Sequence, residues 1–122
     1  MKVVTGGCCR HHGRSGPINL FSDEWRTPLS YQTACDALLD LALSEIAGLL
    51  HVGGPERMTR LEMGQRIAAY FQRPTTSLHP TSRLDGSPAE PRPRDCSLDS
   101  SLWRSHLPNA PWPTLEESLR AE

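Results

Sequence analysis

The chain has 122 residues and a formal net charge of −1, and 37% of its residues are hydrophobic. This length predicts one domain with a modest core. The near-neutral charge gives no reason to expect nucleic acid or an anionic membrane as a partner, and no apolar run approaches the roughly 20 residues of a membrane span. The N-terminus has no secretory h-region, and the four cysteines lack a disulfide-like rhythm, so we expect a reduced, cytoplasmic protein.

Residues 1–15 (MKVVTGGCCRHHGRS) differ in character from the rest, so we expect a divergent, flexible segment here and one domain over residues 16–122. MKVVTGG resembles the first strand and glycine turn of a dinucleotide-binding unit. The further glycines that let the backbone of such a unit approach a pyrophosphate are missing. Metal-ligating side chains crowd the next five positions: Cys8, Cys9, His11 and His12. Tetrahedral sites usually draw spaced pairs of ligands from separate elements. We therefore expect neither a working cofactor loop nor a metal site in this segment.

The first ordered elements are a strand and a helix. Ile18 and Leu20 alternate with a polar residue, as in a β-strand, and the stretch that follows turns the chain. Ser30 then caps a helix that extends to Ile46. The apolar stripe of this helix is wide, so we expect burial on more than one side, with Cys35 as a small buried residue within it.

The central stretch, residues 48–71, predicts a short buried strand, a glycine loop and an amphipathic helix. The apolar run at 49–52 ends at Gly-Gly-Pro, because paired glycines and a proline interrupt a ladder. We interpret His51, at the end of this strand, as a satisfied core histidine rather than a catalytic one. Thr59 and Glu62 form a capping box, and apolar residues recur behind it at helical spacing.

The last third of the chain alternates loops with short elements. Residues 75–79 predict a short strand, and residues 91–99 are held extended by their prolines. A short helix with Trp103 follows, and Thr114 and Glu117 form a second capping box at the start of a last helix. The whole pattern predicts an α/β fold, with a few short strands and three or four helices but no complete doubly wound sheet.

Four stretches resemble a known family in their order and spacing: FSDEWRTP at 21–28, HVGGP at 51–55 with the TRLEMG helix, RPRDCSLD at 92–99 and the final TLEESL. They are similar to the C-terminal substrate-binding part of dTDP-4-dehydrorhamnose reductase-like proteins, which are extended short-chain dehydrogenases/reductases. The resemblance covers roughly residues 16–120. The resemblance implies that the chain is the substrate-binding domain of an NAD(P)-dependent sugar-nucleotide reductase. The implied fold is an incomplete Rossmann-type fold, and the implied ligand is a nucleoside-diphosphate sugar. The implied parent reaction is NADPH-dependent reduction of a 4-keto-6-deoxy sugar.

The same motifs also resemble a non-catalytic relative, the regulatory subunit of methionine adenosyltransferase. The alternative is therefore a binding or regulatory module without chemistry. The two alternatives share this half of the sequence, and its motifs do not separate them.

The family implies catalytic parts that this sequence does not carry. Its members have an N-terminal Rossmann domain with a glycine-rich NAD(P) loop and a Tyr-x-x-x-Lys pair whose tyrosine is the general acid. Here Tyr31 is followed four residues on by Cys35, Tyr70 is followed by Pro74, and Lys2 is the sole lysine. We expect no catalytic residue and no NADP(H) or NAD(H) site in this chain alone. A gene fragment, an internal-deletion product and a genuine subunit, paired with a separate Rossmann-domain chain or a homo-oligomer, all fit this pattern.

The resemblance places two arginines at the substrate diphosphate: Arg26, after the turn near the first strand, and Arg92, in the Arg-Pro segment. A guanidinium carries a permanent charge and can give bidentate hydrogen bonds to phosphate oxygens. The alternative is that both are surface arginines paired with neighbouring carboxylates. Trp25, beside Arg26, either stacks on a base or sugar or anchors the turn.

Overall fold

The computed structural model describes residues 16–85 and 93–120, and this part of the chain forms two small sheets and four α-helices. The elements in chain order are β1 (Ile18–Phe21), β2 (Trp25–Arg26), α1 (Tyr31–Ala42), β3 (Met58–Thr59), α2 (Arg60–Tyr70), the 3-10 helix η1 (Thr75–Ser77), β4 (Leu78–Thr81), α3 (Ser101–His106) and α4 (Leu115–Arg120). The small α/β fold that the sequence predicts is confirmed. Within the described residues, no helix is long and apolar enough to cross a membrane.

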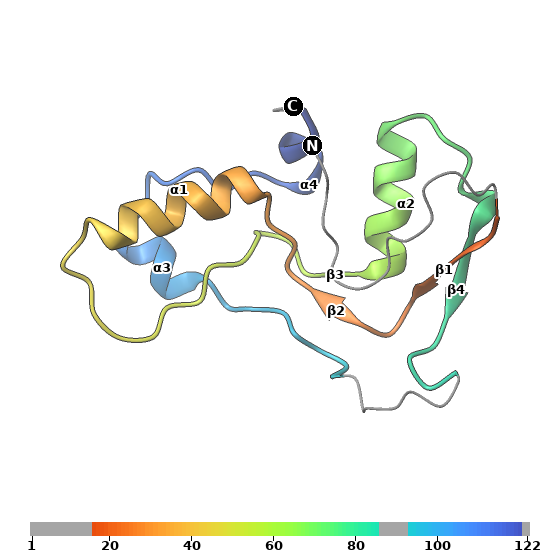
Figure 1. Ribbon diagram of the computed structural model, residues 1–122, viewed down its shortest axis with the longest axis horizontal. Coiled ribbons are helices and arrows are strands. Elements are labelled where there is room, and N and C mark those ends of the chain that lie inside the picture. The colour runs from red at the N-terminus through yellow and green to blue at the C-terminus, as the bar shows by residue number, and fades with distance from the viewer. Residues whose placement is uncertain (1–15, 86–92, 121–122) are drawn as a thin grey trace.

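One side of the molecule is organised around α2. The strands β1 and β4 pair in parallel, with Ile18 opposite Leu78, and α2 packs against both of them (Figure 1). Gly64 lies at this contact, where a Cβ would meet the flexible end of the Leu20 side chain on β1. The helix also contacts β3, η1 and α4, so it holds this side of the fold together.

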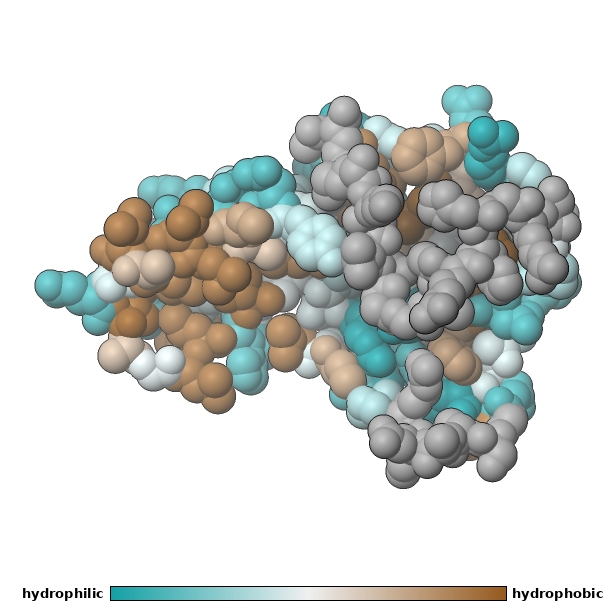
Figure 2. Space-filling view, viewed as in Figure 1, coloured by the Kyte–Doolittle hydropathy of each residue, from teal (hydrophilic) through white to brown (hydrophobic). Residues whose placement is uncertain are grey.

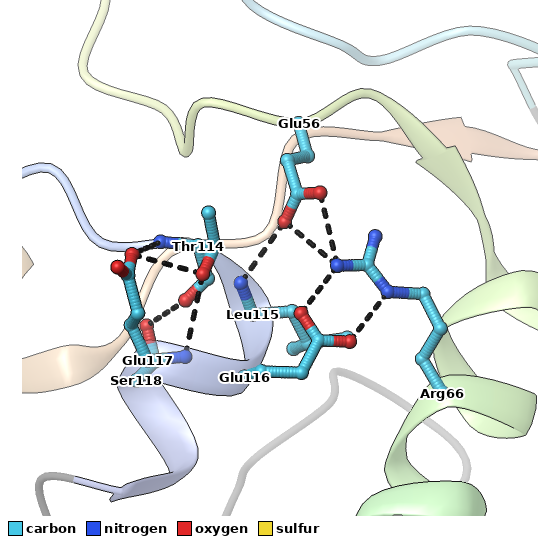
Figure 3. A network of polar contacts seen from close by, with 7 residues as sticks. All are labelled: Glu56, Arg66, Thr114, Leu115, Glu116, Glu117 and Ser118. Atoms are coloured by element: carbon cyan, nitrogen blue, oxygen red, sulfur yellow. Dashed lines mark hydrogen bonds and ion pairs between the residues drawn. The ribbon is translucent and has the colours of Figure 1, made fainter.

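A polar network ties α4 to α2 (Figure 3). Arg66 on α2 donates from Nε to Glu116 Oε1 (2.7 Å) and from Nη2 to Glu56 Oε2 (3.0 Å). The same Glu56 oxygen accepts from the backbone N–H of Leu115 (3.0 Å). The contact to Arg66 lowers the pKa of Glu116 and raises that of Arg66. The network therefore fixes the start of α4 beside α2.

A two-stranded ribbon, β2 and β3, lies between the α2 side and the other side of the molecule, which carries α1 and α3 (Figure 1). In β2 and β3, Trp25 pairs antiparallel with Thr59, and on its other edge Trp25 bridges Asp95. The backbone N–H of Trp25 donates to the Arg94 carbonyl (2.9 Å), and its carbonyl accepts from Cys96 N–H (3.1 Å). Segments that are far apart in the sequence thus meet at Trp25.

The Gly-Gly-Pro loop joins three further segments. Gly53 N–H donates to Ser100 Oγ (2.8 Å), and Gly53 O accepts from the Trp112 indole N–H (2.8 Å). Gly54 N–H donates to the Thr27 carbonyl (3.1 Å). A Cβ at Gly54 would collide with the carbonyl of Pro28, so only glycine lets the two backbones lie this close.

Three helix starts that the sequence predicts are confirmed. Thr33 N–H donates to Ser30 Oγ (3.1 Å), and Glu62 N–H donates to Thr59 Oγ1 (3.1 Å). At the last helix, the Thr114 backbone N–H donates to the Glu117 carboxylate (2.8 Å), and the Glu117 backbone N–H donates to the Thr114 hydroxyl (3.3 Å). All three begin their helices at the predicted places.

The predicted strand at residues 49–52 is wrong. That stretch is irregular, no described strand pairs with it, and 82% of Leu49 is exposed. A strand needs a neighbour to accept its backbone hydrogen bonds, and the described residues supply none. His51 is exposed rather than a core residue. The strand expected at 75–79 starts later, as β4, after a 3-10 turn.

The first long helix also departs from the prediction. It ends at Ala42 with Leu43 as its C-cap, not at Ile46. Burial on more than one side is wrong as well, because only Thr33 and Ala37 are buried on this helix. Its exposed residues include Leu38, Leu39 and Cys35, and 88% of Leu43 is exposed.

Candidate functional site

Arg26, the first of the two predicted diphosphate ligands, lies on β2 with 27% of its side chain exposed. Its Nη1 donates to the neighbouring Trp25 carbonyl (2.6 Å), and its Nη2 donates to Glu24 Oε2 (3.2 Å). The guanidinium is therefore held in one orientation and is still partly open to solvent. This agrees with the alternative that Arg26 pairs with a neighbouring carboxylate, and the pairing does not enclose the guanidinium completely.

The partner carboxylate, Glu24, is completely buried. Its Oε2 atom also accepts from Nε of Arg60 (3.0 Å), whose side chain is 20% exposed. Arg60 is the first residue of α2, directly after the capping Thr59. One buried carboxylate thus lies between guanidiniums from two elements that are more than thirty residues apart. The sequence analysis considered Glu24 only as one of several possible partners of a surface arginine, and it missed Arg60.

A signal for Arg60 was nevertheless present in the sequence. The first turn of a helix carries a positive partial charge and favours acidic residues. An arginine immediately behind the cap at Thr59 is therefore unfavourable for the helix by itself. Such a position is better explained by a partner elsewhere, and here that partner is Glu24.

A third arginine lies on the adjacent strand edge and is engaged differently. The Arg57 guanidinium carbon lies 4.0 Å from the centroid of the Trp25 ring, a cation–π contact. Its Nη2 also donates to Asp95 Oδ2 (2.6 Å), and this contact, with hydrogen bonds from Ser97, holds the pKa of Asp95 far below its usual range. One face of the Trp25 ring is thus covered by Arg57, which favours the anchoring role over stacking on a base at that face.

The turn that carries the site is fixed by Asp23. This carboxylate accepts from Ser82 Oγ (2.7 Å) and from the Arg83 backbone N–H (2.8 Å). These hydrogen bonds lower the pKa of Asp23. The turn after β4 is thereby held against the turn between β1 and β2.

Several predicted features lie outside the described residues: Arg92, the MKVVTGG stretch, and the candidate ligands Cys8, Cys9, His11 and His12. Within residues 16–85 and 93–120, no group of three or more His, Cys, Asp or Glu residues could hold a metal ion. Arg94, next to the Arg-Pro segment, is exposed. The described part of the site therefore consists of Glu24, Arg26 and Arg60, with Trp25 and Arg57 beside them.

Comparison with protein families decides what kind of domain carries this arrangement. The family model described as "RmlD substrate binding domain" matches residues 7–121, nearly the whole chain. The chain belongs to this family. This match confirms the family resemblance inferred from the FSDEWRTP, HVGGP and RPRDCSLD motifs.

Solved structures agree on the fold of this RmlD substrate-binding domain. One neighbour is dTDP-4-dehydrorhamnose reductase from Bacillus anthracis in complex with NADP, with a TM-score of 0.73, 20% identity and coverage of 87% of this chain and 37% of that chain. The Yersinia enterocolitica dTDP-4-dehydrorhamnose reductase matches with a TM-score of 0.72, 20% identity and coverage of 88% and 37%. The dTDP-glucose 4,6-dehydratase from Bacillus anthracis, in complex with NAD, matches with a TM-score of 0.66 and 15% identity. The match covers 87% of this chain and 33% of that chain.

These likenesses are at low identity and concern the fold. The chain spans little more than a third of the length of the two reductases. No curated protein sequence matches the chain significantly.

Proposed function

We propose that this chain binds a nucleoside-diphosphate sugar, as the substrate-binding portion of a sugar-nucleotide reductase, and does not carry out the reduction by itself. The proposal rests on membership of the RmlD substrate-binding family and on one observation within the family motif. Arg26 of FSDEWRTP is oriented by a buried carboxylate and remains partly exposed. A fixed, part-exposed guanidinium is suited to hold phosphate oxygens.

Arg92 completes the proposed diphosphate clamp. It lies between Pro91 and Pro93, and prolines restrict the backbone on both sides of it to extended conformations. Little further conformational entropy is therefore lost when its guanidinium binds a ligand. We propose that Arg26 and Arg92 contact the diphosphate from separate segments.

The proposal assigns the hydride-transfer chemistry to residues outside this sequence. The chain has no Tyr-x-x-x-Lys pair, so NADP(H) or NAD(H) and the general acid come from a separate Rossmann-domain chain or from further sequence of the same protein. We also place the protein in the cytoplasm, because the free thiols of Cys35 and Cys96 suit a reducing compartment.

The test is a ligand-observed NMR titration of dTDP-glucose against the wild-type chain, Arg26→Ala, Arg92→Lys and Arg92→Ala. We expect wild-type affinity of about millimolar, because only one part of the binding site is present. A charge-assisted hydrogen bond contributes about 1.5–3 kcal/mol, so each alanine variant should weaken binding about tenfold or more. Arg92→Lys should weaken it less, because lysine keeps the charge and loses the fork.

The control variant is Arg73→Ala, which removes an exposed arginine just past the end of α2 and should bind as the wild type does. Equal binding by the wild type and all of the Arg26 and Arg92 variants would remove the proposed clamp. A parallel fluorescence titration with NADPH should show no saturable change. A micromolar dissociation constant for NADPH would contradict the division of roles.

A further inference from the structure

Among residues 16–85 and 93–120, Glu24 forms ion pairs with two arginines, so its one negative charge does not balance both of theirs. One carboxylate, with none of its surface exposed, faces the guanidiniums of Arg26 and Arg60. We propose that Arg60 is a second anion-binding residue beside Arg26, and that Glu24 is the positioning residue that holds the two guanidiniums together. This inference deepens the proposed function and depends on it for the identity of the ligand.

The shared oxygen fixes how the two arginines lie. Nη2 of Arg26 and Nε of Arg60 both donate to Oε2 of Glu24, at 3.2 and 3.0 Å. The two guanidiniums are therefore neighbours, separated by no more than two hydrogen bonds. Two like charges at this separation repel each other, and the carboxylate between them offsets only one of the two. The remaining positive charge of Arg26 and Arg60 therefore favours the binding of one more anion beside them.

Arg60 has the donors that such an anion requires. It contacts Glu24 through Nε, and within residues 16–85 and 93–120 its Nη1 and Nη2 atoms have no hydrogen-bond acceptor. Those two atoms are the pair that an arginine presents end-on to a carboxylate or phosphate. Their side chain is part-exposed rather than enclosed, so a ligand can reach them.

Stability alone does not account for the cluster. A buried ionic group can often be replaced by apolar residues of similar volume without loss of stability. Arg60 also lies at the positive end of the 11-residue helix α2, where a cation is disfavoured. The helix terminus and both guanidiniums add positive potential in the same place, and a diphosphate carries enough negative charge and enough oxygens to span Arg26 and Arg60.

Arg57 is the useful contrast. It lies one residue before β3, but its guanidinium is already occupied by Asp95 and by the Trp25 ring. The Asp95 carboxylate balances the charge of Arg57, so Arg57 attracts a further anion less strongly than Arg60 does. The inference therefore assigns the anion to the Arg26–Arg60 pair and not to arginines in general along this edge.

The test uses inorganic pyrophosphate as the probe, titrated into the full chain while the arginine Nε–H signals are followed by ¹H–¹⁵N NMR. The Arg26 and Arg60 signals should shift together and saturate. Arg60→Ala and Arg26→Ala should each weaken pyrophosphate binding about tenfold, and Arg73→Ala should leave it unchanged. Equal pyrophosphate affinity in Arg60→Ala and the wild type, or no saturation in the wild type, would overturn the inference.

The role of Glu24 is tested with Glu24→Asp, which keeps the charge but shortens the side chain so that one oxygen no longer reaches both arginines. It should weaken pyrophosphate binding several-fold in the wild type and less in the Arg60→Ala background, where Glu24 orients Arg26 alone. An equal loss in both backgrounds would mean that Glu24 acts only on the fold. If Glu24→Asp does not fold, the coupling is measured between Arg26→Ala and Arg60→Ala, whose effects should be non-additive.

A matched titration with dTDP separates this inference from the proposed function. If dTDP binds no tighter than pyrophosphate while the arginine variants still weaken both, the nucleotide-sugar assignment fails and the anion site stands. If dTDP binds tighter and depends on Arg26 but not on Arg60, the proposed function stands and this inference fails.

Discussion

The helices α1 and α2 have 12 and 11 residues and both begin at a hydroxyl cap, yet they are held in the fold in different ways. α2 packs against β1, β4, β3 and α4, whereas α1 makes few close backbone contacts with other described elements and buries only Thr33 and Ala37. Hydrophobic residues consequently gather over α1 at the left of the view in Figure 2. They include three exposed leucines of α1 and its C-cap: Leu38, Leu39 and Leu43.

The comparison shows that a capped sequence can specify a helix without specifying what covers it. α1 is supported by local contacts, the Ser30 cap and a hydrogen bond from Gln32 to Asp36 (2.9 Å). α2 has its own cap and, in addition, the Arg66 network and the two strands beneath it. Stability should therefore depend strongly on residues around α2 and at the junction between the two sides, and weakly on the leucines of α1.

The largest effect is expected at the junction. In Gly54→Ala the new methyl group meets the Pro28 backbone carbonyl, which cannot move without displacing the chain that leads into α1. We expect a loss of on the order of 4 kcal/mol or more in the free energy of unfolding, enough to abolish much of the folded population. Urea unfolding monitored by circular dichroism measures it.

The matched control is Gly64→Ala on α2. There the methyl group meets only the end of the Leu20 side chain, which can rotate, and alanine favours the helix by about 1 kcal/mol over glycine. We expect a net change within about 1 kcal/mol. Comparable losses in the two variants would mean that the junction is no more constrained than the α2 side.

The next effect contrasts a buried side chain beside α2 with an exposed one on α1. Met58 is almost fully buried, so Met58→Ala should cost about 3 kcal/mol, within the range for removing a buried methionine. Leu39→Ala should change stability by no more than about 0.5 kcal/mol, as for other surface positions. Thermal melts of both variants provide the measurement. A loss of several kcal/mol in Leu39→Ala would show that α1 is covered in solution.

The smallest effect concerns the ion network of Figure 3. A double-mutant cycle with Arg66→Ala and Glu116→Gln should give a coupling of about 0.5–1 kcal/mol at pH 7, because both side chains are part-exposed. The pKa of Glu116 is lowered in the folded state. Its stabilising contribution is therefore present above the unfolded pKa and is lost as the pH falls through the folded value.

The coupling should accordingly be smaller at about pH 3, which lies below the usual glutamate pKa of roughly 4.3, because Glu116 with its lowered pKa is protonated in part of the folded molecules at that pH. Cycles measured by urea unfolding at the two pH values test this. A coupling that is unchanged at acid pH would mean that the Arg66–Glu116 contact does not contribute through charge.

The sequence by itself determined the features that depend on neighbouring residues. The caps at Ser30, Thr59 and Thr114 each join groups three residues apart, so their residue types are sufficient to predict them. The family motifs could be recognised for a similar reason, because they consist of residue types at fixed spacings along the sequence. The family match confirms them. Arg26 was predicted in this way and lies part-exposed on β2, while its role at a diphosphate, like that of Arg92, remains a prediction.

Only the tertiary structure decided the features that need a distant partner. Residues 49–52 have the composition of a strand, but a strand forms only where another backbone accepts its hydrogen bonds, and the described residues offer none there. The exposure of Cys35 and Leu39 has the same cause, since burial belongs to the covering surface and not to the helix. The Glu24–Arg60 contact joins the turn before β2 to the start of α2 across thirty-six positions, a separation over which no local pattern identifies the partner.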